Sequence, residues 1–244
     1  MIVAGFHPVR EVLEKRPRSI ETLWVVRGRQ DARAGEIEEL ARAAGVAVRV
    51  VPRDELDRLA GKAHNGVAAR VASRDYDDVD ACLSGSPGTR TVLFLDQVTD
   101  PGNVGAILRT AAAAGASVVL AERHSAGLGE AASKAAAGAL ERVKIARAGN
   151  ASQFLEKAKA AGFWVFGADP AGRSLWESDL SGDVLLCLGS EGEGLRRLTR
   201  ESCDHLVSIP MAKGAGSLNV SVAAGVLLYE VARRRVGREV AARK

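Results

Sequence analysis

The sequence has few of the residues that build disulfide frameworks or metal sites. Its 244 residues include three cysteines, Cys82, Cys187 and Cys203. No two of them form a Cys-x-x-Cys pair, and an odd number argues against a disulfide framework, so we expect neither disulfides nor a metal. Cys187 stands inside the apolar run Val-Leu-Leu-Cys-Leu and is interpreted as a small core residue.

Long apolar runs and leader sequences are also absent. No run approaches the roughly 20 residues that a membrane-spanning helix needs. The N-terminal sequence MIVAGFHPVREVLEK meets charge too early for a signal peptide. With 47% hydrophobic residues, the chain can bury a sizeable core in one or two domains. We therefore expect a soluble, cytoplasmic protein with no membrane partner.

Two common nucleotide-binding motifs are missing as well. A dinucleotide-binding protein would show Gly-x-Gly-x-x-Gly after its first strand, and a P-loop would show Gly-x-x-x-x-Gly-Lys-Ser/Thr. The sequence DPGNVGAILR at 100–109 lacks the first spacing, and the second motif occurs nowhere. These absences argue against a nicotinamide enzyme and against a P-loop enzyme.

Positive charge is concentrated at the end of the chain. The net charge is +4, and residues 233–244 hold six Lys or Arg residues against one Glu. Two explanations stay open for this tail. It is either a solvated helix end whose cations complement the macrodipole, or a segment that contacts phosphate groups.

The hydrophobic pattern predicts two domains. Residues 1–72 alternate short helices and strands, which indicates a small α/β unit, and residues 73–90 gather Asp, Ser, Gly and Pro like a linker. Residues 91–244 carry an alanine-rich helix at 130–141 and six apolar strand candidates, near 91–96, 117–121, 142–148, 163–169, 183–188 and 205–211. Helical stretches separate these strands, so we expect a mostly parallel sheet with helices on both faces.

Polar loops follow these strands, where open α/β sheets bind their ligands. They read QVTDPGNVG, GADPAG, GSEGEG and AKGAGSLN, and three of them are rich in Gly, Ser and Asn. In GSEGEG, a helix N-terminus explains Glu193 better than Glu191, which lies between glycines. In the last loop Ser217 and Asn219 are both good N-cap residues, but only one of them can cap the final helix.

Arg109 lies in the helical run after the first loop and raises a question of its own. Its i±3 and i±4 neighbours are all small: Gly105, Ala106, Ala112 and Ala113. No carboxylate can therefore pair with its guanidinium along the helix.

At these residues the sequence resembles the SpoU (TrmH-like) family of RNA 2′-O-methyltransferases, within the SPOUT superfamily. The blocks DQVTDPGNVGAILRTA, LGSEGEGLRRL and IPMAKGAGSLNVSVAAGVLLYE look like its motifs one, two and three, and the match covers 91–236. AGFHPVREVL and AHNGVAARV (63–71) resemble the RNA-recognition domain of the bacterial 23S rRNA guanosine-2′-O-methyltransferases, which more usually have Gln where Asn65 stands. The resemblance implies a trefoil knot, which general topology rules argue against.

The resemblance also implies a cofactor and a site. S-adenosyl-L-methionine would be held mainly by the backbone of loops that include Gly167, Leu188, Gly189, Ile209, Met211 and Leu218. The catalytic set would be Asn103, Arg109, Glu191, Ser217 and Asn219. Residues 1–72 would bind RNA, with candidate contacts at Lys62, His64 and Asn65, whereas Trp24 is expected in the core.

Methyl transfer requires the ribose 2′-hydroxyl to lose its proton, and none of the four histidines lies in a motif. Family accounts sometimes make the arginine of motif one, here Arg109, the base. Neutralising a guanidinium with a pKa of 12.5 or more would cost roughly 7 kcal/mol at pH 7. We instead expect Arg109 to bind a neighbouring phosphate and to stabilise the developing oxyanion. Asn103 and Asn219 would orient groups, Ser217 would contact RNA or cofactor, and the role of Glu191 stays open.

Two alternatives to a 23S rRNA guanosine-2′-O-methyltransferase remain: a tRNA enzyme of the same family and a non-catalytic RNA-binding paralogue. The N-terminal domain argues against the first, and the intact motif residues argue against the second. A homodimer is expected from the resemblance and from the last helix, 217–236. Its apolar residues form a band wider than one stripe: Val220, Val222, Ala223, Val226, Leu227, Leu228 and Val231.

Overall fold

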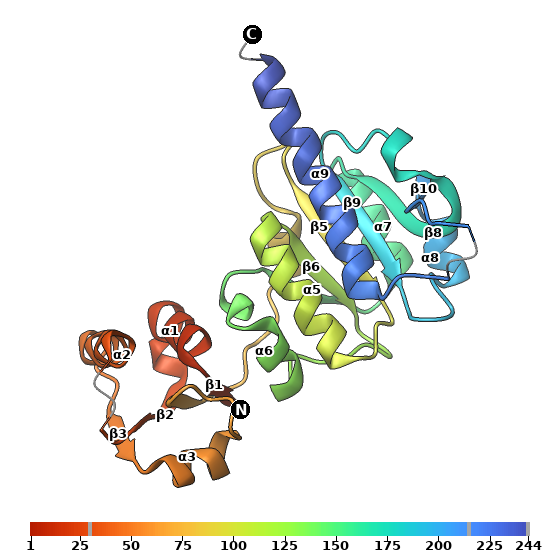
Figure 1. Cartoon of the computed structure of the whole chain (residues 1–244). Helices are drawn as coiled ribbons and strands as arrows, with labels where there is room; N and C mark the ends of the chain where they lie inside the picture. The colour runs from red at the N-terminus through yellow and green to blue at the C-terminus, as the bar shows by residue number, and fades with distance from the viewer. Residues whose placement is uncertain (29–30, 214–215, 243–244) are drawn as a thin grey trace. The chain divides into compact units, whose positions relative to one another are not determined.

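The computed structural model describes residues 1–28, 31–213 and 216–242, with side chains in the last helix as far as Arg235. The chain forms two compact units (Figure 1). The N-terminal unit comprises Met1–Asp75 together with Gly127–Arg142, and the sheet unit comprises Tyr76–Ala126 and Val143–Lys244. In the described part of the chain, no helix is both long and apolar enough to cross a membrane.

The N-terminal unit is a small sheet with helices on both faces. Its first segment contains β1 (Ile2–Ala4), α1 (Phe6–Lys15), η1 (Pro17–Ser19), β2 (Ile20–Val26), α2 (Ala32–Ala43), β3 (Val48–Val51), α3 (Arg53–Ala60) and β4 (Val67–Val71). The strand order is β1-β4-β2-β3, with β2 and β3 parallel. Apolar residues of α1 and α2 pack on one face of the sheet, and Leu56 of α3 packs on the other against Trp24. Trp24 is therefore a core residue, as predicted.

The second segment of this unit differs from the single helix that alanine propensity predicts. Helix α6 (Glu130–Ala136) ends at Ala137, which has a positive φ, and η2 (Ala139–Glu141) follows. Gly138 permits the break, because a Cβ there would lie 3.3 Å from the Cα of Pro8. The Glu141 carboxylate, 4% exposed, accepts hydrogen bonds from Nε and NH2 of Arg16 at 2.7 and 2.9 Å. Tertiary contacts thus decide this segment's structure.

The sheet unit has six strands, and every neighbouring pair in the described residues is parallel. The order is β10-β8-β9-β5-β6-β7. The strands are β5 (Thr91–Asp96), β6 (Ser117–Ala121), β7 (Ile145–Ala148), β8 (Trp164–Ser174), β9 (Val184–Gly189) and β10 (His205–Ser208). The mostly parallel sheet is therefore confirmed, because fully buried strands such as β5 carry the continuous apolar runs that predict them.

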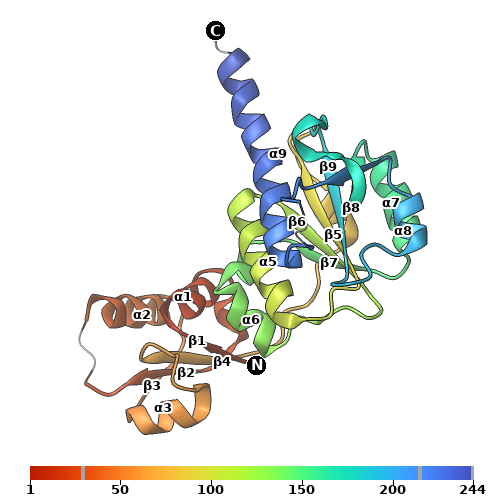
Figure 2. The same cartoon turned by 45° about the vertical axis from the view of Figure 1, so that its right-hand side comes forward.

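Helices cover both faces of this sheet, also as predicted. They are α4 (Val79–Leu83), α5 (Pro101–Ala114), α7 (Ala151–Ala160), α8 (Arg197–Glu201) and α9 (Val220–Ala242), with η3 at Leu175–Glu177. Helices α5 and α9 lie side by side on one face, and α7 lies on the other (Figure 1, Figure 2). Cys82 and Leu83 of α4, and Cys187 of β9, are buried in the core on the α7 face.

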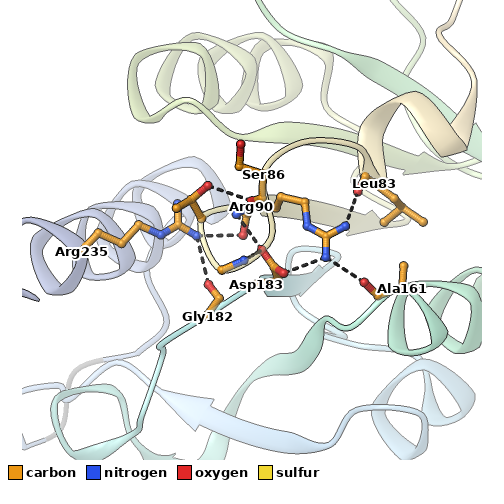
Figure 3. A network of polar contacts seen from close by, with 9 residues as sticks. Leu83, Ser86, Arg90, Ala161, Gly182, Asp183 and Arg235 are labelled. Carbon is orange, nitrogen blue, oxygen red and sulfur yellow. Dashed lines mark hydrogen bonds and ion pairs between the residues drawn. The ribbon is translucent and has the colours of Figure 1, made fainter.

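A polar network fastens α9 to the strand ends opposite the polar loops (Figure 3). Arg90 donates from NH2 to Asp183 Oδ2 at 2.7 Å and from its two terminal nitrogens to the carbonyls of Leu83 and Ala161. Asp183 Oδ1 accepts the N–H groups of Gly88 and Arg90. Arg235 of α9 donates to the Arg90 carbonyl at 2.8 Å. Burial alone would raise the pKa of Asp183, but these hydrogen bonds outweigh it and hold that pKa below its ordinary value.

We expect Asp183→Asn to lower the free energy of unfolding by about 3–5 kcal/mol at neutral pH, because it leaves the buried Arg90 guanidinium without a counter-charge. The folded-state pKa of Asp183 lies below that of an unfolded carboxyl. The stabilisation is therefore complete above the unfolded pKa and is lost as the pH falls through the folded one. Urea unfolding at several pH values should show that the difference in the free energy of unfolding between wild type and variant becomes smaller as the pH falls.

The control is Asp54→Asn, which breaks the exposed pair with Arg58 on α3 and should change stability by no more than about 0.5 kcal/mol. Equal effects of the two substitutions would show that the Arg90–Asp183 pair is not what secures this end of the sheet.

Candidate functional site

Three predicted site residues from three distant segments form one chain of hydrogen bonds. Asn103, in the first turn of α5, donates from Nδ2 to Oε1 of Glu191. Its Oδ1 accepts a hydrogen bond from Nδ2 of Asn219 at 3.0 Å. The contacts join residues 88 and 116 positions apart, at the carboxyl ends of β5 and β9 and the start of α9. Both ends of the Asn103 amide are thereby occupied, which fixes its orientation.

Local chemistry places each member of this chain. Asp100 caps α5 by accepting the N–H of Asn103 at 2.6 Å, and Pro101 occupies the first helical position. Asn219 caps α9, since its Oδ1 accepts the N–H of Ser221 at 2.9 Å. Asn219, and not Ser217, is therefore the N-cap, and the final helix begins at Val220 instead of at 217.

The loop after β9 carries Glu191 on a tight turn. Ser190 and Gly194 exchange backbone hydrogen bonds of 3.1 and 3.0 Å, and Gly192 and Gly194 have positive φ angles that favour glycine. A Cβ on Gly189 would overlap the backbone of Gly194 and Leu195. Gly189 is thus required for close packing of the loop on the end of its own strand, and Glu191 is left exposed at the tip.

An ion pair between the buried Asp96 and the exposed Arg196, which the sequence did not reveal, holds the other end of this loop. Asp96, the last residue of β5, is 0% exposed. Its carboxylate accepts hydrogen bonds from Nε of Arg196 at 2.7 Å and from the Arg196 backbone at 3.2 Å, and NH2 lies 2.6 Å away. The sequence signal for this pair was the position of Asp96, an acidic residue at the end of an otherwise apolar strand. The pair joins the loop of Glu191 to the strand that leads to Asn103.

Arg109 and Ser217 are exposed, and neither side chain makes a hydrogen bond or an ion pair within residues 1–28, 31–213 and 216–242. On α5, Arg109 shares its face with Ala106 and the exposed Ala113. The guanidinium therefore lies on a helix face with only small side chains around it, as its i±3 and i±4 neighbours predicted. The structure brings Asn103, Glu191 and Asn219 together, and it leaves Arg109 and Ser217 free for a ligand.

The residues predicted to hold a cofactor fall into two groups. Met211 is exposed and Ile209 and Leu218 are half-buried, so they offer apolar surface, and the backbones of Met211 and Leu218 bond to no described residue. Leu188 and Gly167 are buried. A Cβ at Gly167 would meet side chains of Leu195, Cys203 and Leu206 at 2.8–2.9 Å. These residues fit a ligand that is bound by backbone groups and covered by apolar side chains. Leu188 and Gly167 would contribute backbone groups only.

The predicted RNA-contact loop between α3 and β4 presents two of its three named residues. His64 is fully buried, its Nδ1 accepts the N–H of Gly66 at 2.8 Å, and its Nε2 lies 2.7 Å from Asp57 Oδ1. The proton therefore belongs on Nε2, and the imidazole supports the loop from inside. Lys62 and Asn65, the latter with a φ of 46°, are exposed.

Part of the basic C-terminal segment is occupied by internal contacts. Arg233 and Arg234 both donate to the buried carboxylate of Glu230, and Arg234 also donates to the Trp176 carbonyl at 2.9 Å. Arg235 belongs to the network of Figure 3. The other three basic residues of 233–244 lie beyond the described side chains.

Two family models match separate parts of the sequence. The SpoU rRNA Methylase family matches residues 90–229. The RNA 2′-O ribose methyltransferase substrate-binding family matches residues 2–77. The first match contains the chain of hydrogen bonds around Asn103, and the second contains the loop around His64.

Individual relatives match over nearly their whole length. The 23S rRNA (guanosine-2′-O-)-methyltransferase RlmB of Yersinia pestis is 42% identical over 239 residues, which are 96% of this chain and 97% of the relative. The SpoU methyltransferase AviRb of Streptomyces viridochromogenes, crystallised with AdoMet, superposes with a TM-score of 0.80 at 31% identity, covering 97% and 90% of the two chains. An AdoMet-bound rRNA methyltransferase of Sinorhizobium meliloti gives a TM-score of 0.80 at 28% identity, covering 96% and 87%.

Proposed function

Because the chain belongs to the SpoU rRNA methylase family, we propose that it transfers the methyl group of S-adenosylmethionine to the ribose 2′-hydroxyl of a guanosine in 23S rRNA. The observation that carries the proposal is the Glu191–Asn103–Asn219 chain, which unites one residue from each sequence block at one edge of the sheet. The full-length similarity to a 23S rRNA guanosine methyltransferase supports the choice of substrate.

The chain's own residues have separable tasks in this reaction. The chemistry that S-adenosylmethionine supplies when bound is an electrophilic methyl group, held beside the backbones of Gly189, Met211 and Leu218. Asn103, fixed by Glu191 and Asn219, orients groups around the acceptor oxygen. Arg109 binds a phosphate beside the target ribose and stabilises the negative charge that develops on the 2′-oxygen as its proton passes to water, because a free guanidinium is a strong hydrogen-bond donor to both groups.

The N-terminal unit selects the RNA in this proposal. Its match to the substrate-binding family supports the role, and the exposed Lys62 and Asn65 are its candidate contacts. Residues 1–72 are assigned to RNA binding, 73–90 to a linker and 91–244 to methyl transfer in the cytoplasm, although Gly127–Arg142 of the last range packs within the N-terminal unit. The alternative is a tRNA guanosine methyltransferase, and the test must distinguish it from a 23S rRNA enzyme.

The test is methylation by the purified protein of 23S rRNA, and separately of tRNA, each from cells that lack this gene. Ribose methylation mapped by alkaline hydrolysis should appear at one guanosine of 23S rRNA and be absent from tRNA. Methylation of tRNA alone would establish the alternative. RNA binding without methyl transfer, with S-adenosylmethionine bound, would indicate a non-catalytic paralogue.

We also infer a homodimer with the family's trefoil knot. Support for the dimer comes from α9, where Val222 and Tyr229, seven residues apart on one face, are 50% and 54% exposed. Sedimentation equilibrium at low micromolar concentration should give twice the chain mass. Tyr229→Glu should shift the protein toward a monomer, whereas Glu156→Gln, an exposed change on α7, should not. A wild-type monomer that binds cofactor would contradict the inference.

A further inference from the structure

The loop that follows β6 is a basic segment whose side chains have no assigned task. It contains Arg123, His124 and Ser125, and it leaves the sheet at the same edge as the loop that leads into α5, because β5 and β6 are parallel neighbours. The N–H of Ala126 donates to the carbonyl of Val98 at 2.9 Å. This hydrogen bond joins the loop to the segment that leads to Asp100, the N-cap of α5, which accepts the N–H of Asn103.

The side chains of this loop are available for a ligand. Arg123 and His124 are exposed, and within the part of the chain that the structure describes neither makes a hydrogen bond or an ion pair. The hydroxyl oxygen of Ser125 is buried and also has no described partner. Because this oxygen is buried, a ligand from solution does not reach it, and Arg123 and His124 are the side chains that the loop presents.

The surroundings favour an anion at this loop. Arg147, at the carboxyl end of the adjacent strand β7, lies 4.6 Å over the ring of Tyr76 and donates to the Glu122 carbonyl at 3.5 Å. The nearest carboxylate in sequence is Glu122, whose Oε2 is close to Gly149 and forms no ion pair with Arg123 in the described residues. His124 has a φ of 58°, a left-handed conformation that histidine adopts more readily than most residues other than glycine.

We propose that Arg123 and His124 form a phosphate-binding subsite of the RNA site, which takes a phosphodiester flanking the target nucleotide. The inference rests on the proposed function and names a contact beyond it. Arg123 supplies a planar fork that matches a phosphate, and the histidine ring can add a donor beside it. Along the chain, this loop is followed directly by Gly127–Arg142 of the N-terminal unit.

The test is the binding of a 23S rRNA fragment by Arg123→Gln, measured by fluorescence anisotropy at several salt concentrations. We expect binding at 150 mM salt to weaken about three- to tenfold. The affinity ratio of wild type to variant should shrink roughly threefold between 50 and 200 mM salt, because one lost phosphate contact lowers the log–log slope by about 0.7–0.9. Affinity for S-adenosylmethionine, measured by calorimetry, should stay unchanged.

The matched control is Arg197→Gln, which removes the same charge from the exposed surface of α8, on the opposite side of the strand order. It should change RNA affinity less than twofold and leave the salt slope unchanged. His124→Asn, which tolerates a positive φ, should weaken binding less than Arg123→Gln does. If Arg123→Gln and Arg197→Gln have the same RNA affinity and salt dependence on an rRNA that the wild type methylates, the subsite is refuted and the proposed function stands. If the wild type neither binds nor methylates the rRNA, the proposed function is refuted with it.

Discussion

Arg109→Ala should reduce methyl transfer to RNA by about 10²–10³-fold while leaving affinity for S-adenosylmethionine within about twofold of wild type. The guanidinium has no partner among the described residues, so its removal leaves no buried charge unpaired. Alanine is also the better helix former, and α5 should lose no stability. Single-turnover methylation and calorimetry on the same protein separate the two quantities.

The conservative variant decides what Arg109 does. Arg109→Lys keeps the charge but loses the planar fork, and we expect most of the rate to be lost with it. Arg197→Ala, on the exposed face of α8, is the control for general loss of charge and should retain activity. Full activity of Arg109→Lys would show that bidentate geometry is unimportant. Full activity of Arg109→Ala would remove this residue from the site.

The sheet was predictable because its signal is local. A strand buried on both faces must be apolar along its whole length, and β5 and β9 are read directly from such runs. The first and last residues of each strand were harder to predict, because a strand extends only as far as the neighbouring strand pairs with it. The apolar pattern suggested a strand from 142, but β7 pairs with β6 only from Ile145, after Arg142 has turned with η2 into the N-terminal unit.

Contacts between distant residues were predictable only through the edge rule for parallel sheets. That rule gathers the loops of Asn103 and Glu191 at one edge, but it gives no pairing between side chains. It missed the Asp96–Arg196 pair, which joins residues 100 positions apart. It also gave no direction for a side chain, and His64, in a polar loop, points inward to Asp57.

The segment 127–142 shows the limit of local propensity most clearly. Alanine content favours a helix but says nothing about which unit the helix joins. That is decided by Glu141 and Arg16, 125 positions apart, whose ion pair lies within the N-terminal unit. A chain shortened to begin near Gly88 would therefore leave the Glu141 carboxylate without its partner. Tests of RNA selection are better made by substitution at Lys62 and Asn65.

Gly189→Ala should abolish measurable S-adenosylmethionine binding, with at least a hundredfold loss of affinity. The added Cβ would overlap backbone atoms of Gly194 and Leu195, and backbone cannot rotate away as a side chain can. The loop must then move as a whole, although the hydrogen bonds of Arg196 to the buried Asp96 hold its far end in place. Displacement at Gly189 would also carry Glu191 away from Asn103, so that cofactor binding and the geometry around Asn103 are lost together.

The loss should be confined to the site, because the loop lies at the edge of the sheet and the strands beneath it are unchanged. Far-UV circular dichroism should match wild type, and the melting temperature should fall by several degrees only. Gly35→Ala, in α2 with open space at its Cβ, is the matched control and should bind cofactor normally. If folded Gly189→Ala protein binds S-adenosylmethionine as the wild type does, the turn at 189–194 does not form the cofactor site, and the backbones of Met211 and Leu218 must hold the ligand without it.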